Sequence, residues 1–135
     1  MTFADTNVLI DVATNSSEWA EWSRRALAAA HARGPLLINV VVYAEFAISF
    51  ASAKACDAEL APFDLTIAEI PREAAFRAAQ AFRDYRRAGG ARTAVLPDLF
   101  IGAHAAVLKL PLLTRDARRY RAYFPEVSVL APEGS

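Results

Sequence analysis

Four acidic residues lie at points of the chain where side chains can do chemistry: Asp5, Glu45, Asp98 and Asp116. Asp5 and Asp116 each follow a short apolar segment that is typical of a buried strand. Asp98 opens an apolar helical segment, and Glu45 stands among apolar neighbours, which directs its carboxylate inward. Because the carboxyl ends of parallel strands meet at one edge of a sheet, we expect these four carboxylates to face one pocket.

The chemistry of such a pocket follows from its charge. Crowded carboxylates repel one another and remain ionised together only when a cation lies among them. Oxygen ligands suit Mg²⁺ or Mn²⁺, whereas Cys56, His31 and His104 are too scattered to offer zinc its usual ligands. The four acids therefore predict a divalent-metal site that activates water to hydrolyse phosphodiester bonds.

Each acid also has a local alternative role. Asp5 could cap a short helix that begins near Val8, and Asp116 could cap the last helix of the chain. Asp98 could simply favour the positive N-terminal end of its helix, and Glu45 could lie on the surface in an ion pair. These roles explain single acids but not the gathering of all four at one sheet edge.

The elements that must position these acids alternate along the chain. Strands are predicted at residues 2–4, 36–38, 63–67, 110–114 and 127–130. Helices are predicted from about residue 8, over 19–30, from Asn39 to about 50, over 71–88, over 97–108 and over 116–123, although residues 40–42 also suit a strand. Alternating strands and helices indicate an α/β fold with a parallel sheet, and we expect one domain over residues 1–135.

Composition narrows the function classes. The 135 residues are 55% hydrophobic with a single cysteine, so internal disulfides are excluded and a reducing, cytoplasmic compartment is expected. Neither a signal peptide nor a membrane span is expected. The formal net charge is zero, yet residues 72–123 hold eleven basic and four acidic residues. This basic half could hold a polyanion, or it could simply be an arginine-rich surface.

Four segments of the chain resemble the ordered motifs of PIN-domain nucleases. They are Asp5-Thr6-Asn7-Val8-Leu9-Ile10-Asp11, Tyr43-Ala44-Glu45, the run from Leu96 through Asp98 to Ala105, and Leu112-Leu113-Thr114-Arg115-Asp116 followed by Arg118-Arg119-Tyr120. Their order, their spacing and the chain length are similar to those of VapC toxins from bacterial type II toxin–antitoxin pairs. The resemblance covers nearly the whole chain, with all four acidic positions retained.

The resemblance implies a PIN-like three-layer α/β/α sandwich with a short-stranded parallel sheet and Mg²⁺- or Mn²⁺-dependent endoribonuclease activity. Asp5, Asp98 and Asp116 match the metal-binding acids of the family, and Glu45 matches its fourth catalytic acid. Further positions match residues that order the acids or the attacking water: Thr6, Asn7 and Thr114.

The resemblance also implies partners: a homodimer, a VapB-type antitoxin that inhibits the toxin, and an RNA substrate. Arg115 lies between two motif residues and is placed to meet phosphate, while Arg118 and Arg119 form a basic patch that could bind RNA. Surface charge alone would also explain these arginines. Two alternative functions remain open, an RNA-processing nuclease without a toxin role and a module that binds RNA or an antitoxin without cutting.

Overall fold

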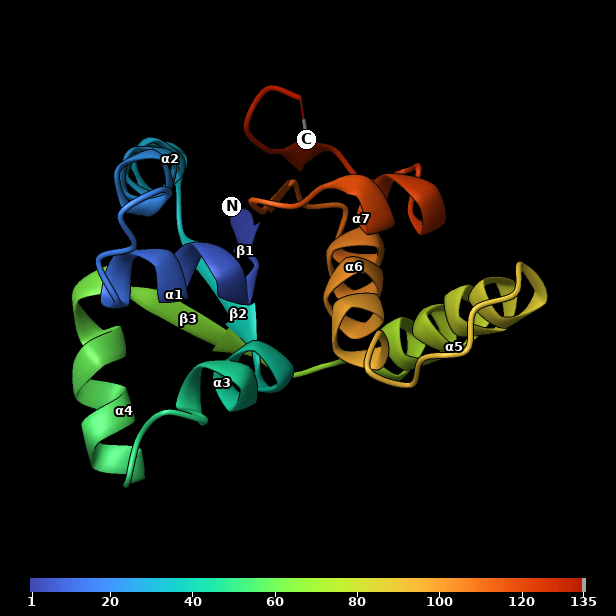
Figure 1. Ribbon diagram of the computed structural model, residues 1–135, viewed down its shortest axis with the longest axis horizontal. Coiled ribbons are helices and arrows are strands. Elements are labelled where there is room, and N and C mark those ends of the chain that lie inside the picture. The colour runs from blue at the N-terminus through green and yellow to red at the C-terminus, as the bar shows by residue number, and fades with distance from the viewer. Residues whose placement is uncertain (135) are drawn as a thin grey trace.

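The computed structural model describes residues 1–134 as a three-layer α/β/α sandwich around a five-stranded sheet, which confirms the predicted fold class (Figure 1). All strand pairs are parallel, and the strand order is β3-β2-β1-β4-β5. The strands are short: β1 (Thr2–Ala4), β2 (Leu36–Asn39), β3 (Leu65–Ala68), β4 (Leu112–Leu113) and β5 (Val129–Leu130).

Helices connect and cover the strands. They are α1 (Thr6–Ala13), α2 (Ala20–Arg33), α3 (Val40–Ala47), α4 (Ala53–Leu60), α5 (Arg72–Arg87), α6 (Leu96–Leu108) and α7 (Arg118–Tyr123), with a 3-10 turn at Ala61–Phe63. Figure 1 shows α2 on one side of the sheet and α5, α6 and α7 on the other. Burial on both faces explains why the strands are apolar runs rather than alternating patterns.

Strand β1 lies in the middle of the sheet, with the strands β2 and β3 on one side and the later strands β4 and β5 on the other. From β1 the chain moves outward through β2 to β3, and α5 and α6 then carry it back to β4 on the other flank of β1. Asp5 directly follows β1, so it sits at the topological switch point, where open parallel sheets hold their ligands.

Most predicted elements are present, with shifted bounds. The first helix begins at Thr6 rather than near Val8, because Asp5 itself supplies the N-terminal cap. Asn39 caps α3 as predicted, since its Oδ1 accepts the backbone N–H groups of Val41 and Val42 at 3.0 Å each. The segment after Asn39 is therefore helix and not strand.

Helix α4 was not predicted. It buries only Cys56 and Leu60, and small or charged residues fill the rest of its length. Without large apolar residues at helical spacing, the segment gives no periodic signal. Ser52 caps this helix through a bond from the Ala55 backbone N–H to its Oγ at 3.1 Å, and that cap was the available clue.

Gly102 on α6 is required by close packing. A Cβ atom at this position would lie 2.4 Å from the ring of Phe124, which is fully buried directly after α7. The glycine therefore lets α6 and the end of α7 approach closely. This approach sets the distance between Asp98, near the start of α6, and the side chains of α7.

His104 belongs to the core. Its ring is fully buried 5.1 Å from that of Phe3, and its Nδ1 lies 3.2 Å from Asn39 Nδ2. Burial lowers the pKa of His104, so the ring is neutral.

None of the helices in residues 1–134 has the length and apolar content of a membrane span.

Candidate active site

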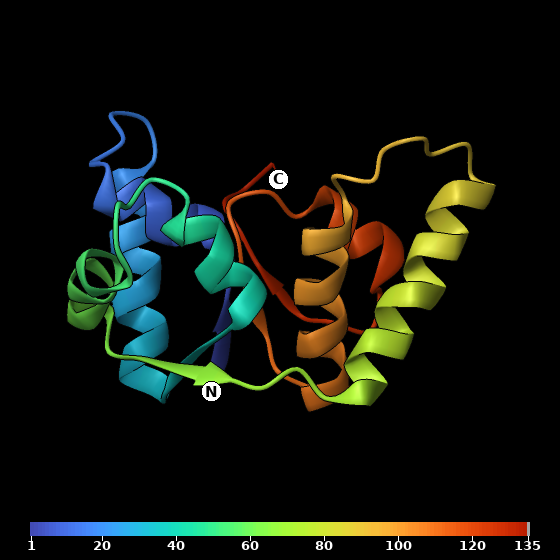
Figure 2. The ribbon, with the colours of Figure 1, turned by 90° about the horizontal axis from the view of Figure 1, so that it is seen from below.

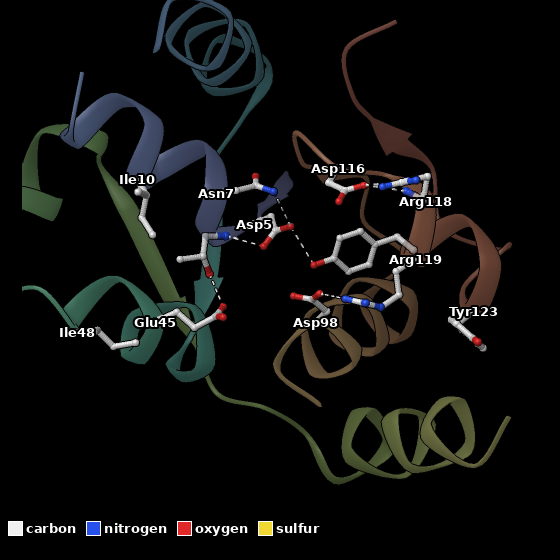
Figure 3. Close-up of a pocket in the computed structure, with 12 residues that line it drawn as sticks. Asp5, Asn7, Ile10, Glu45, Ile48, Asp98, Asp116, Arg118, Arg119 and Tyr123 are labelled. Atoms are coloured by element: carbon white, nitrogen blue, oxygen red, sulfur yellow. Dashed lines mark hydrogen bonds and ion pairs between the residues drawn. The ribbon is translucent and has the colours of Figure 1, made fainter. Parts of the chain in front are cut away.

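A pocket of about 660 Å³ opens at the carboxyl edge of the sheet, and all four predicted acids line it (Figure 3). Its walls come from both ends of the chain. The lining residues are Asp5, Thr6, Asn7, Ile10, Glu45, Ile48, Asp98, Asp116, Arg118, Arg119, Tyr120 and Tyr123. Side chains up to 118 positions apart in sequence thus share one cavity, as the topology predicts.

Asp5 is the most enclosed of the four acids, with 5% of its surface exposed. Its Oδ1 accepts the Thr6 backbone N–H at 2.7 Å, and its Oδ2 accepts the hydroxyls of Thr114 at 2.8 Å and Tyr120 at 2.9 Å. Burial, assisted by the nearby charge of Asp98, raises the pKa of Asp5 to about 6 despite these donors. Asp5 therefore both caps α1 and presents a desolvated carboxylate to the pocket.

Asn7 and Thr114 form the scaffold behind Asp5. The Asn7 side-chain amide donates to Thr114 Oγ1 at 3.2 Å, and its Oδ1 accepts the Arg115 backbone N–H at 3.1 Å. Thr114 Oγ1 also accepts the Asp116 backbone N–H at 3.1 Å. These bonds tie the segment after β4 to the start of α1, and thereby fix Asp116 relative to Asp5.

Glu45 reaches the pocket from α3. The Thr6 hydroxyl donates to Glu45 Oε1 at 2.7 Å, so the residue after Asp5 positions the fourth acid. Burial, together with the charge of Asp98, raises the pKa of Glu45. The local alternative of a surface ion pair is not what the structure has, since the partner of Glu45 is a neutral hydroxyl.

Asp98 and Asp116 form the opposite side of the pocket and have cationic partners. Arg119 Nη1 lies 2.5 Å from Asp98 Oδ2, and Arg118 Nε lies 3.8 Å from Asp116 Oδ1 (Figure 3). Burial and the charge of Asp116 together raise the pKa of Asp98 more than its ion pair with Arg119 lowers it. Asp116 is the most open of the four, with 61% of its side chain exposed.

Arg115 is directed away from the pocket. Its guanidinium binds Asp11 through Nε at 2.8 Å and Nη2 at 3.2 Å, and it lies 5.7 Å from the Trp19 ring. Asp11 is buried and also accepts the Ser23 hydroxyl at 2.9 Å. The backbone N–H of Arg115 contacts Asn7 in the scaffold of the site, whereas its guanidinium, expected at phosphate, pairs with Asp11 and is not part of the pocket lining.

Tyr120 is a pocket residue bonded to Asp5 to which the sequence reasoning gave no role. Its phenol is buried and donates to Asp5, while burial and the neighbouring carboxylates raise its pKa well above the usual range, which keeps it a donor. The available signal was its position four residues after Asp116, one helical turn further along a segment otherwise rich in arginine.

The donor set of the pocket suits a hard divalent cation. Its acids offer only oxygen, and burial raises the pKa values of Asp5, Glu45 and Asp98, so a cation in the pocket would stabilise their ionised forms. Among residues 1–134, however, no three His, Cys, Asp or Glu side chains come together in the spacing of a preformed metal site. Asp98 and Glu45 are instead engaged by Arg119 and Thr6.

Fold and pocket together define the class: an α/β protein with an acidic pocket at the switch point of a parallel sheet. The chain belongs to the PIN-domain family, whose model matches residues 2–125. This confirms the resemblance drawn from the four motifs and places the chain in a class of nucleases acting on nucleic acids. No curated protein sequence matches the chain significantly.

Several solved structures share the fold. VapBC2 from Rickettsia felis, bound to a DNA fragment from its promoter, has 16% identity and a TM-score of 0.73 over 96% of this chain and 97% of that one. FitAcB from Neisseria gonorrhoeae has 19% identity and a TM-score of 0.69 over the full length of both chains. A toxin–antitoxin complex from Klebsiella pneumoniae has 26% identity and a TM-score of 0.66 over 96% of each chain.

Proposed function

We propose that this chain is a metal-dependent endoribonuclease and the toxin of a type II toxin–antitoxin pair. The observation that carries the proposal is the convergence of Asp5, Glu45, Asp98 and Asp116 on one pocket. The similarity to toxin–antitoxin complexes supports the toxin role. The oxygen-only donor set supports Mg²⁺ or Mn²⁺ as the cofactor.

Asp5, Asp98 and Asp116 would hold the cation, and Glu45 would orient the attacking water from the α3 side of the pocket. When bound, the cation lowers the pKa of a coordinated water and neutralises charge that develops on the phosphate. Thr114 and Tyr120 hold Asp5 in place by donating to its Oδ2. Thr6 and Asn7 fix Glu45 and the Asp116 segment relative to Asp5.

The basic half of the chain would bind the RNA backbone. Arg118 and Arg119 line the pocket itself. Figure 2 shows the C-terminal end of α5 and the segment after it at the same edge of the molecule as the start of α6. Four further arginines lie on that end of α5 and the following segment: Arg83, Arg86, Arg87 and Arg92. A single-stranded polyanion that leaves the pocket would meet this positive surface.

The remaining partners follow from the toxin role. A VapB-type antitoxin would inhibit the enzyme, two copies of the chain would form a homodimer, and the enzyme would act on RNA in the cytoplasm. The R. felis neighbour is a VapBC2 complex bound to a DNA fragment from its own promoter. By analogy, promoter binding would be the task of the antitoxin.

The central test is to incubate the purified protein with total RNA in Mn²⁺ and in chelator, and to map the cut ends. Asp5→Asn and Asp98→Asn should each lower the cleavage rate at least about 100-fold, because each removes a cation ligand. The matched control is Asp84→Asn, which removes one negative charge from an exposed position of α5 outside the pocket. Wild-type cleavage by both pocket variants would falsify the assignment.

The same experiment separates the alternatives. A module that only binds RNA or antitoxin would leave total RNA uncut with either metal. An RNA-processing nuclease would cut RNA in vitro, yet its expression without any partner would not arrest growth. The toxin role requires growth arrest by the wild type and none by Asp98→Asn at equal protein level.

A further inference from the structure

Two neighbouring arginines of α7 are placed in different ways at the rim of the pocket. Arg119 turns inward, with 35% of its side chain exposed and its Nη1 2.5 Å from Asp98 Oδ2. Arg118 turns outward, with 88% of its side chain exposed and its Nε 3.8 Å from Asp116 Oδ1 (Figure 3). Only Arg119 makes a close contact with a proposed cation ligand.

This contact conflicts with cation binding at the same carboxylate. The guanidinium occupies Oδ2 of Asp98, and its positive charge repels a divalent ion that approaches the pocket. The conflict accounts for a pocket that holds four acids and yet, across the described residues, no preformed triad of ligands. Asp5 and Glu45 lack such a competitor, since they are held by neutral donors, and Asp116 has Arg118 only at 3.8 Å.

The ion pair is also weak enough to exchange. Both side chains are about one third exposed, and ion pairs at such positions contribute little net free energy because water and salt screen them. Arg119 reaches the pocket from a six-residue helix, and the stem of its side chain can swing without moving the backbone. A released guanidinium would remain at the pocket, where its planar fork matches two phosphate oxygens.

We propose that Arg119 is an exchangeable counter-ion: it holds Asp98 while the cation is absent, and it becomes a phosphate ligand for the RNA once the cation takes Asp98. This inference rests on the proposed function, since it requires a divalent cation and an RNA strand in this pocket. Arg119 would thus have two partners one after the other, first Asp98 and then an RNA phosphate, whereas a residue of a general basic patch would have the phosphate alone.

The first test measures Mn²⁺ affinity, by calorimetry or by the electron paramagnetic resonance signal of free Mn²⁺. Arg119→Gln should bind Mn²⁺ about three- to tenfold more tightly than the wild type, because both the competitor and its charge are removed. Arg121→Gln is the matched control, since it removes the same charge from an exposed position of α7 that does not line the pocket, and its change should stay within about twofold. Equal tightening in the two variants, or none in Arg119→Gln, would overturn the proposal.

The second test measures binding of a short, mixed-sequence single-stranded RNA whose 2′-O-methyl groups prevent cleavage. With Mn²⁺ present, Arg119→Gln should bind this RNA about tenfold more weakly than the wild type, because a charge-assisted phosphate contact is lost. In chelator the two proteins should bind alike, since Arg119 is then engaged with Asp98. A loss of the same size in chelator contradicts the exchange.

The outcomes also separate this inference from the function on which it rests. If the wild type neither binds Mn²⁺ nor cuts RNA, the proposed nuclease function fails, and the inference fails with it. If the wild type binds Mn²⁺ and cuts RNA, while Arg119→Gln binds Mn²⁺ no more tightly than Arg121→Gln and loses RNA affinity equally with Mn²⁺ and in chelator, only the inference fails.

Discussion

Asp5 and Asp98 line the same pocket but are held in opposite ways. Asp5 is buried, and its partners are a backbone amide and the hydroxyls of Thr114 and Tyr120, all of them neutral. Asp98 is about one third exposed, and its partner is the cation of Arg119. Neutral donors fix the geometry of a carboxylate without cancelling its charge, whereas a cationic partner cancels the charge in a contact that can exchange.

The difference divides the pocket into a fixed side and an exchangeable side. The fixed side comprises Asp5, Asn7 and Thr114, which bonds between α1 and the segment after β4 hold together. The exchangeable side comprises Asp98 and Asp116, which pair with the arginines of α7. Four changes to the metal-free protein test this division through the free energy of unfolding, from the largest expected effect to the smallest.

The largest effect is expected when the ion pair between Arg115 and Asp11 of α1, next to the fixed side, is removed. Arg115→Met leaves Asp11, whose side chain is 5% exposed, as a buried charge without its bidentate partner. Breaking such a pair should lower the free energy of unfolding by about 3 kcal/mol, measured by urea denaturation. Adding Asp11→Asn should recover part of this loss. If Arg115→Met lowers the free energy of unfolding no more than Arg118→Met does, the Arg115–Asp11 ion pair does not stabilise the fixed side.

The next largest effect has the opposite sign. The pKa of Asp5 rises from the usual 3.8 to about 6 on folding, which lowers the free energy of unfolding by about 3 kcal/mol at neutral pH. Asp5→Asn removes the charge but also its strong hydrogen bonds. In chelator at pH 7, the free energy of unfolding of this variant should therefore exceed that of the wild type by about 2 kcal/mol.

The pH dependence of that gain identifies its source. A carboxyl group whose pKa is higher in the folded state favours folding below pH 3.8, and this contribution is lost as pH rises through about 6. The stability difference between Asp5→Asn and the wild type should therefore grow from pH 4 to pH 6 and then level off. Thermal melts in chelator across this range measure it. If Asp5→Asn were less stable than the wild type at pH 7, the buried charge of Asp5 would not destabilise the fold.

A smaller effect is expected from removing one donor on the fixed side. Tyr120→Phe should cost about 1 kcal/mol, because the Asp5 carboxylate loses the phenol bonded to it at 2.9 Å. The same loss raises the pKa of Asp5 further, so in chelator the pH range over which Asp5 lowers the free energy of unfolding should move to higher pH. Tyr123→Phe, which alters another phenol of the pocket lining, is the control and should leave that range in place.

The smallest effect is expected on the exchangeable side. Asp98→Asn should change the free energy of unfolding by less than about 0.5 kcal/mol, because the ion pair that it removes is partly exposed. Cleavage should nevertheless be lost, as for Asp5→Asn. A stability change as large as that of Asp5→Asn would show that the two acids are held alike.

The sequence predicted most of the fold because strands and helices leave local signals. The apolar segment before Asp5, the cap at Asn39 and the proline at the start of α6 each mark a boundary that depends on neighbouring residues alone. Helix α4 was missed because its buried residues, Cys56 and Leu60, are too few to form a pattern.

The candidate site was predictable only to the level of residue types. Parallel topology brings Asp5 and Asp116 to one edge, since they follow the paired strands β1 and β4. Glu45 and Asp98 reach the same edge from α3 and from the start of α6. The partners of each acid were not predictable, because they are chosen by side-chain packing across the chain. Arg115 meets Asp11 across 104 positions and Tyr120 meets Asp5 across 115, and no local pattern records such pairs.

The central position of β1 has a consequence for biosynthesis. Within this chain, Asp5 is made before β4, Asp116 and α7. A nascent chain that ends before β4 lacks the flank of the sheet that closes the pocket. The activity proposed for this pocket would therefore begin only once the segment through α7 has been made.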